Sequence, residues 1–301
     1  MAKTRKLLQE NLGLVDVVIE LSDARIPLSS RNPDLAMLVG NRKPLIRAYN
    51  KTDLADPQVT GQWQKSLAGT DIYNVFISSA TGAGLTELMY IANEQIKMKL
   101  VRDKVRGLLT SKLRIMIAGI PNSGKSTLIN KLSGRRAAAA ADKPGVTRGK
   151  QWIRINESIE LLDTPGVLWP KFDNPEVALN LAFTGTIGEN AVDPEELAAL
   201  LLAKINSDYK SSIERRYKVV LKEILAEFPE HQLHNNVGSQ RYLNGNNELL
   251  LKEGTIILDG IGRKRGFLSE GGRIDTLRTS IMILDEFRGG RIGRISLERP
   301  S

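Results

Sequence analysis

The residues Gly119-Ile-Pro-Asn-Ser-Gly124-Lys125-Ser126 decide the fold of this 301-residue chain. They match the pattern G-x-x-x-x-G-K-[ST], follow an apolar run and open a helix-like stretch. Glycines let backbone N–H groups turn inward around phosphates, and a helix N-terminus adds partial positive charge. Lys125 is placed to reach β- and γ-phosphates, and Ser126 to ligate Mg²⁺. The sequence predicts a phosphate-binding loop, which alone does not separate ATP from GTP, with contacts from Asn122, Ser123, Gly124, Lys125, Ser126 and Thr127.

Short apolar runs rich in valine, isoleucine and leucine recur around this loop, most of them bounded by Gly, Pro, Asn or Asp. Nearly continuous apolar strands that alternate with helices are typical of a parallel sheet covered on both faces, so we predict an α/β domain. The predicted strands are Leu14–Leu21, Leu45–Tyr49, Ile72–Ile77, Leu113–Ala118, Trp152–Ile155 and Ile159–Leu162. The predicted helices are Pro57–Leu67, Leu85–Leu100 and Lys125–Leu132.

After about Pro175 the pattern changes to helix-like stretches, and few runs of strand type remain. Asp193 before Pro194 is typical of an N-cap followed by a first-turn proline. We therefore predict two domains, residues 1–174 of α/β type and residues 175–301, which are smaller, mostly helical and basic. The helices predicted in the second domain are Glu176–Ile187, Pro194–Ile205, Ser211–Glu227 and Arg278–Phe287.

Two further segments are candidates for the metal and the γ-phosphate. Asp163-Thr-Pro-Gly166 follows an apolar run, and an aspartate at a strand end beside a phosphate loop is placed to hold Mg²⁺, usually through water. Gly166 offers a backbone N–H to the γ-phosphate, and the hydroxyl of Thr147 in the preceding loop would complete the Mg²⁺ shell. In isolation D-T-P-G is also an ordinary turn. We expect Mg²⁺ at Ser126, Thr147 and Asp163, and catalytic contributions from Lys125, Thr147 and Gly166.

Two segments nearer the N-terminus carry the chemistry of guanine recognition. In Asn50-Lys51-Thr52-Asp53, the carboxylate of Asp53 can accept hydrogen bonds from guanine N1–H and the exocyclic amine, which adenine does not offer in that arrangement. Asn50 would brace neighbouring loops, the stem of Lys51 would cover the base plane, and Ser78-Ser79-Ala80 would give a backbone N–H to guanine O6. Because strand carboxyl ends line the crevice of an open α/β sheet, these motifs should converge on one GTP or GDP site.

Composition excludes several classes of function. The chain has no cysteine, which removes disulfides, thiolate zinc sites and cysteine nucleophiles. Its two histidines, His231 and His234, lie outside every motif. The N-terminus lacks an apolar signal core, and no run of 18 apolar residues occurs, so we expect a cytoplasmic protein without a membrane partner. The net charge of +9 favours polyanionic partners.

The order of the motifs is unusual, because the base-reading segments precede the phosphate loop. This order resembles that of the circularly permuted GTPases, and most closely the ribosome-biogenesis GTPase A family. Beyond the four motifs, the resemblance rests on Met1-Ala-Lys, Asp23-Ala-Arg-Ile-Pro27, Ser30-Arg-Asn-Pro33, Leu168-Trp-Pro-Lys171, Gly262-Arg-Lys-Arg-Gly266 and Gly271-Gly272. It implies a ribosome-stimulated GTPase that binds the large ribosomal subunit through ribosomal RNA and ribosomal proteins, with an RNA-binding second domain. Nothing suggests a fixed oligomer, so we expect a monomer.

Two details of the resemblance concern hydrolysis. Family members carry a Trp-Phe-Pro-Gly-His segment just before Met-Ala-Lys, and its histidine is held to help hydrolysis because the residue after D-T-P-G is apolar. Here that residue is Val167, and the given chain begins at Met1, so either its start lies upstream or unaided hydrolysis is slow. Asn122 matches the asparagine that in related GTPases is linked to K⁺, which makes potassium stimulation a hypothesis.

Basic residues crowd both ends of the chain, and arginine suits bidentate phosphate contacts. With few aromatic residues among them, we predict phosphate-led RNA binding with steep salt dependence. The residues are Lys3, Arg5 and Lys6, and then Arg263, Lys264, Arg265, Arg273, Arg278, Arg288, Arg291, Arg294 and Arg299.

Three functions remain open from the residues alone. The first is an enzyme switch, in which GTP orders the loop at Thr147 and the segment after Gly166 and thereby repositions the second domain. The second is a guanine-nucleotide-sensing RNA-binding module with negligible hydrolysis, which Val167 motivates. The third is a P-loop kinase or ATPase, which the guanine-reading carboxylate of Asp53 disfavours.

Overall fold

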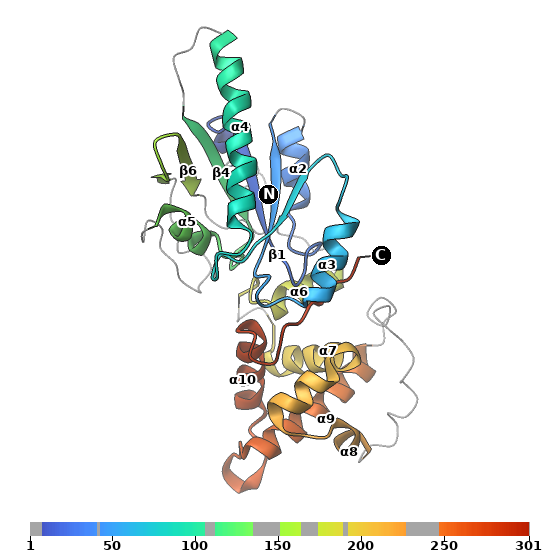
Figure 1. Cartoon of the computed structure of the whole chain (residues 1–301). Helices are drawn as coiled ribbons and strands as arrows, with labels where there is room; N and C mark the ends of the chain where they lie inside the picture. Colours follow the sequence, from blue (N-terminus) through green and yellow to red (C-terminus); the bar gives the residue numbers. More distant parts are fainter. Residues whose placement is uncertain are drawn as a thin grey trace. The chain divides into compact units, whose positions relative to one another are not determined.

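The computed structural model of the chain describes residues 8–40, 43–105, 112–134, 151–163, 174–188, 192–226 and 247–300 (Figure 1). For Ile96, Arg102, Gln151, Asp163 and Asn247 it describes the backbone alone. The chain divides into two compact units, of which the second comprises Asp173–Leu297. The first comprises Met1–Phe172 together with Glu298–Ser301. The last residues, which the sequence analysis placed in the second domain, therefore belong to the first unit.

The first unit is built on a six-stranded sheet with the order β3-β2-β1-β4-β6-β5. The strands are β1 (Val17–Asp23), β2 (Leu45–Asn50), β3 (Tyr73–Phe76), β4 (Leu113–Gly119), β5 (Gln151–Arg154) and β6 (Ile159–Asp163). All neighbouring strands are parallel except β5 and β6. The predicted α/β fold is confirmed, but the prediction of a fully parallel sheet is wrong at this edge. Residues 155–158 are too few for the crossover that parallel pairing would need.

Side chains that alternate along β1 enter two different cores. Val17, Ile19 and Leu21 pack against α4 and α5 on one face of the sheet. Val18 packs against α2 on the other face. Helix α3 covers Tyr49 and Phe76 near the carboxyl ends of β2 and β3. The sheet is therefore covered on both faces, by α2 (Pro33–Val39), α3 (Pro57–Ser66), α4 (Leu85–Val105) and α5 (Lys125–Ser133).

The direction of strand addition changes between β1 and β4. Strands β1, β2 and β3 follow one another toward one edge, whereas β4 returns to the other side of β1 and is followed outward by β6. Leu21 of β1 pairs with Gly119 of β4, and Asp23 pairs with Asn50 of β2. In open α/β sheets ligands bind beyond the strand carboxyl ends at such a point. The phosphate loop begins there.

The second unit is helical, as predicted. Its helices are α6 (Pro175–Phe183), α7 (Pro194–Tyr217), α8 (Leu221–Ala226), α9 (Asn247–Arg265), the 3₁₀ helix η5 (Glu270–Gly272) and α10 (Thr276–Arg288). The side chain of Asp193 accepts hydrogen bonds from the backbone N–H groups of Glu195 and Glu196, which confirms the predicted cap. Within the described residues, no helix is long and apolar enough to cross a membrane.

Helices α7 and α8 divide the chain differently from the sequence prediction. The segments expected as separate helices, Pro194–Ile205 and Ser211–Glu227, form the single helix α7 followed by the short α8. The break expected near residue 208 is reduced to one residue, Tyr209, with non-helical φ of −124° and ψ of 26°. Residues Leu197–Ala203 are buried before Tyr209, and Ile213 and Tyr217 are buried after it, so packing on both sides of the break favours one long helix over two short ones.

Helix α9 was not predicted, because its glycines lower helix propensity. The packing explains why they are present. A Cβ atom on Gly254 would lie 1.8 Å from the carbonyl oxygen of Ala199 on α7, and one on Gly260 would lie 2.6 Å from a methyl of Ile224 on α8. Close approach between helices therefore outweighs propensity along α9.

Candidate nucleotide-binding site

The phosphate loop connects β4 to α5. Asn122 and Gly124 have left-handed φ angles of 59° and 92°, an arrangement that points successive backbone N–H groups into a concave anion-binding surface. A Cβ atom on Gly119 would lie 2.5 Å from the carbonyl oxygen of Leu21, so the close approach of the loop to β1 requires glycine. The Ser123 hydroxyl donates to a carbonyl of the same loop at 2.9 Å. The backbone thus fits a phosphate group.

Lys125 is buried at the start of α5. Its ammonium group donates to the carbonyl oxygens of Gly119 at 3.1 Å and Ile120 at 2.8 Å, so the loop's own backbone holds the cation. Ser126 and Thr127 follow in the first turn, where helical N–H groups have no partner within the helix. A fixed cation and unsatisfied donors at one place suit a polyphosphate.

Asn50 joins the phosphate loop to the base-reading segments. Its Nδ2 donates to the carbonyl oxygen of Ser123 at 2.8 Å, and its Oδ1 accepts from the backbone N–H of Ser79 at 2.8 Å. Because Asn50 is only 2% exposed, both bonds lie where competition from water is weak. A Cβ atom on Gly124 would lie 2.3 Å from the same Nδ2. The brace predicted for Asn50 is confirmed.

Asp53 and Ala80 lie on the base-reading side of Asn50. Asp53 is half-buried, and its carboxylate makes no hydrogen bond to any residue in the described part of the chain. The Ser78 hydroxyl accepts from the N–H of Thr81 at 3.1 Å, which closes the turn that contains the exposed Ala80. The Ser79 hydroxyl is buried without a partner in the same described set. Of these groups, the carboxylate of Asp53 is the one that is both partly exposed and without a hydrogen bond to a described residue.

Sequence reasoning missed the role of Asp23 at the end of β1. Its carboxylate accepts from Arg25 at 3.0 and 2.8 Å and pairs with the ammonium of Lys51 at 3.1 Å. Burial raises the pKa of Asp23, but Arg25 and Lys51 outweigh it and hold that pKa well below its usual range. Burial lowers the pKa of Lys51, against the opposing effect of Asp23. The only sequence signal was an acid and an arginine directly after an apolar strand.

Part of the predicted site lies outside the described residues. The structure does not describe Thr147, Gly166 or Val167, and of Asp163 it describes only the backbone. That backbone pairs with Ile117 in β4, so β6 ends beside the strand that leads into the phosphate loop. The described residues contain no group of three His, Cys, Asp or Glu side chains that could hold a metal ion.

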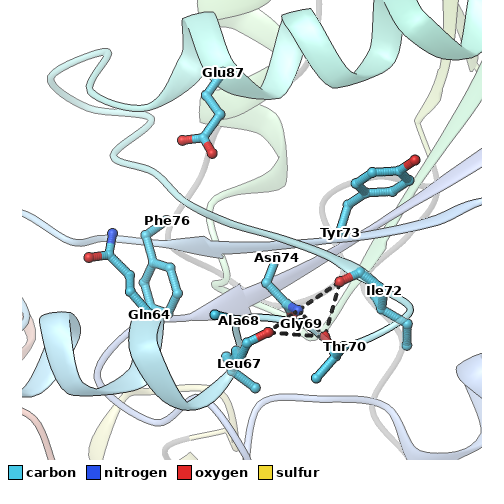
Figure 2. Close-up of a pocket in the computed structure, with 10 residues that line it drawn as sticks. All are labelled: Gln64, Leu67, Ala68, Gly69, Thr70, Ile72, Tyr73, Asn74, Phe76 and Glu87. Carbon is cyan, nitrogen blue, oxygen red and sulfur yellow. Dashed lines mark hydrogen bonds between the residues drawn. The ribbon is translucent and has the colours of Figure 1, made fainter.

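A separate pocket of about 390 Å³ lies between the end of α3, the loop that follows it, β3 and Glu87 of α4 (Figure 2). Asn74 donates to the hydroxyl of Thr70 and to the carbonyl of Ile72, both at 2.8 Å. None of the motif residues lines this pocket. We therefore do not assign this pocket to the nucleotide.

In the second unit, basic side chains gather around the turn that follows α9. Lys264, Arg265 and Arg273 are exposed, and the guanidinium of Arg278 lies 4.2 Å from the ring centre of Phe267. Arg288 differs, because it donates to the carbonyl oxygens of Phe183 and Ala182 at the end of α6. Arg288 thus has a structural contact that the sequence did not predict. Lys3, Arg5, Lys6, His231 and His234 lie outside the described residues.

Known proteins are similar to the whole chain. A family model described as a 50S ribosome-binding GTPase matches residues 114–227. Ribosome biogenesis GTPase A of Bacillus pumilus is 37% identical over 300 residues, which cover 100% of this chain and 96% of that protein. The protein of the same name from Thermotoga maritima is 26% identical over 298 residues, or 99% and 91% of the two chains.

Among solved structures, GNP-bound YlqF from T. maritima matches with a TM-score of 0.61 and 24% identity over 99% of both chains. The GDP-bound structure of the T. maritima protein matches with a TM-score of 0.60 and 23% identity over 98% of this chain and 99% of that one. At this identity the structural likeness shows a common fold.

Proposed function

Because this chain belongs to the ribosome biogenesis GTPase A family, we propose that it binds GTP and hydrolyses it to GDP and phosphate as an assembly factor of the large ribosomal subunit. The observation that carries the nucleotide part is the position of Asn50. One buried side chain bonds to both the phosphate loop and the Ser79 backbone, which supports a single site for phosphate and base.

Guanine specificity rests on the carboxylate of Asp53. Two donors of guanine, N1–H and the exocyclic amine, match its two oxygens, whereas adenine would leave those oxygens unsatisfied. A backbone N–H at Ala80 would complete the selection by donating to guanine O6. The half-buried position of Asp53 and its lack of a hydrogen bond to a described residue support this role.

For hydrolysis, Lys125 would hold the β- and γ-phosphates. The backbone N–H of Gly166 would donate to the γ-phosphate. Hydroxyl and carboxylate oxygens are ligands that Mg²⁺ prefers, so Ser126, Thr147 and Asp163 would hold it. Bound Mg²⁺ would neutralise charge on the phosphates. Asn122, in the left-handed part of the loop, would add a K⁺ site.

The second unit would supply the grip on ribosomal RNA. Lys264, Arg265 and Arg273 are exposed near one another in sequence, and this suits phosphate contacts. Replacing Lys264 and Arg273 by glutamate should weaken binding to the large subunit and flatten its salt dependence. Lys222→Glu, on the exposed side of α8, is the control for charge change within the same unit. If Lys222→Glu weakens binding to the large subunit as much as the replacement of Lys264 and Arg273 does, a localised RNA surface is contradicted.

The direct test is nucleotide competition followed by turnover. Fluorescent GDP bound to the protein should be displaced by GTP and not by ATP, and large subunits should stimulate phosphate release. Lys125→Ala should abolish both binding and release, whereas Lys65→Ala, an exposed lysine on α3, should leave them unchanged. Displacement by ATP as readily as by GTP would contradict the proposal. Nucleotide binding without stimulated release would favour a sensing module over an enzyme.

A further inference from the structure

The carboxyl end of the chain is bonded to the loop that follows β1. Glu298 accepts hydrogen bonds from the backbone N–H groups of Leu28 at 2.6 Å and Ser29 at 3.0 Å, and also from the Ser29 hydroxyl. Its main-chain carbonyl accepts from the indole N–H of Trp63 on α3 at 3.1 Å. Figure 1 shows the C-terminus beside α3, within the first unit. Glu298 thus contacts two segments that flank the base-reading loop.

The loop held by Glu298 leads directly to Asp23. The backbone N–H of Asp23 donates to the Ser30 hydroxyl at 2.9 Å, and that hydroxyl also bonds to the carbonyl of Ile26 at 2.6 Å. Asp23 in turn pairs with Lys51 of the base-reading segment. A continuous set of bonds therefore runs from Glu298, through residues 26–30 and Asp23, to a side chain expected to cover the base.

The other flank of the base-reading loop is held in the same way. Trp63 is 3% exposed and lies in α3, which begins four residues after Asp53. Asp56 caps this helix by accepting from the backbone N–H of Gln58 at 2.8 Å. A hydrogen bond to Trp63 therefore restrains the helix that starts where the base-reading segment ends.

The covalent path to Glu298 is also restrained. Ser296 is the last but one residue of the second unit, and its backbone N–H and carbonyl both bond to the hydroxyl of Tyr209 at 3.2 Å. Only Leu297 separates this anchor from Glu298 along the chain. The residue two positions before Glu298 is therefore held by hydrogen bonds within the second unit.

We propose that Glu298 is a positioning residue for guanine recognition, acting through the Asp23–Lys51 pair and α3, and this rests on the proposed nucleotide function. A carboxylate is the suitable group, because the Leu28 and Ser29 N–H groups and the Ser29 hydroxyl are all donors and a carboxylate only accepts. Glutamine keeps one acceptor oxygen and replaces the other by a donor, so it should retain part of the effect. Alanine leaves the donors without this partner.

The test compares full-length wild type, Glu298→Ala, Glu298→Gln and the control Glu270→Ala, which changes an exposed glutamate of η5. Affinity is measured for fluorescent GDP and, by competition, for pyrophosphate, which lacks a base. Glu298→Ala should weaken GDP about tenfold and leave pyrophosphate unchanged, because the phosphate loop itself is not altered. The GDP affinity of Glu298→Gln should lie between those of wild type and Glu298→Ala. The GDP affinity of Glu270→Ala should equal that of wild type. The KM for GTP should rise while kcat is retained.

The outcomes separate this inference from the proposed function. If the wild type does not bind GDP, the proposed function fails. If the wild type binds GDP and a folded Glu298→Ala binds it equally well, the inference alone fails. Equal weakening of GDP and pyrophosphate would show a general structural role and would also overturn it. If Glu298→Ala does not fold, Glu298→Gln decides, because a GDP affinity equal to that of wild type would contradict positioning by the carboxylate.

Discussion

The side-chain amide nitrogen Nδ2 of Asn50 lies 2.8 Å from the backbone carbonyl oxygen of Ser123, although the two residues are 73 positions apart in the chain. Asn50 ends β2 and Ser123 lies in the loop after β4, and both strands flank β1. The permuted order of the motifs therefore still brings these loops together, because the sheet and not the sequence order sets which loops meet.

Asp53→Asn should change the base that the protein selects. The mutant amide can donate to the C2 carbonyl of xanthine but repels the exocyclic amine of guanine. Loss of two charge-assisted hydrogen bonds should weaken GDP binding by about 100-fold, while xanthosine diphosphate should bind more tightly than in wild type. Competition against fluorescent GDP and fluorescent xanthosine diphosphate measures both. An unchanged preference for GDP would place the guanine contacts elsewhere.

Asn122 should make turnover sensitive to the monovalent cation. A K⁺ ion held at this position would add fixed positive charge near the β- and γ-phosphates, where charge develops in the transition state. Phosphate release stimulated by large subunits should therefore be faster in KCl than in NaCl at equal ionic strength. Asn122→Ala should remove the difference. Equal rates of the wild type in both salts would exclude the potassium hypothesis.

Gly254→Ala should destabilise the second unit. The new Cβ atom would lie 1.8 Å from the carbonyl oxygen of Ala199, so α9 would have to move away from α7, at a cost of about 3 kcal/mol. Gly61→Ala in α3 is the matched control, because nothing lies within 4 Å of its Cβ position. There alanine should stabilise by about 0.5–1 kcal/mol through helix propensity. Thermal unfolding followed by circular dichroism compares them, and a neutral Gly254→Ala would contradict the close helix contact.

Asp23→Asn should destabilise the first unit by about 3–5 kcal/mol, because it leaves the buried Arg25 without its counter-charge. The folded pKa of Asp23 is depressed, so its contribution is complete above the unfolded value of about 3.9 and is lost as pH falls toward the folded value. The difference from wild type should be constant between about pH 5 and 8 and shrink only below about pH 4.

Urea unfolding followed by tryptophan fluorescence measures this difference, because Trp63 and Trp152 belong to the first unit. The exposed Asp71 provides the control Asp71→Asn, which should behave as wild type at every pH. If the difference in free energy of unfolding between Asp23→Asn and wild type already decreases near pH 6, a group other than Asp23 is responsible for it.

The strand-end positions of the motifs in the described residues could be predicted, because residue type and position both carry information at the end of an apolar strand. Asn50 is the clearest case, since an asparagine after such a strand was expected to brace loops and does. Asp23 could not be assigned in the same way. Its partner Lys51 lies on a different loop, and only the register of β1 against β2 brings the two together.

The contacts of Glu298 and the existence of α9 were also beyond sequence reasoning. Glu298 meets Ser29 across 269 positions, and no local pattern reports such a pairing. Helix α9 contains glycines that local propensity counts against a helix, although tight packing against Ala199 needs one of them. In both cases the missing information is tertiary.

The affinity of Asn50→Ala for fluorescent GDP tests most directly whether the base-reading segments and the phosphate loop form one site. The substitution leaves the Ser79 N–H and the Ser123 carbonyl without their buried partner, so the dissociation constant should rise at least tenfold while the protein stays folded. The exposed Asn93 on α4 supplies the control Asn93→Ala, which should bind as wild type does. A folded Asn50→Ala that binds GDP with the affinity of wild type would contradict the account.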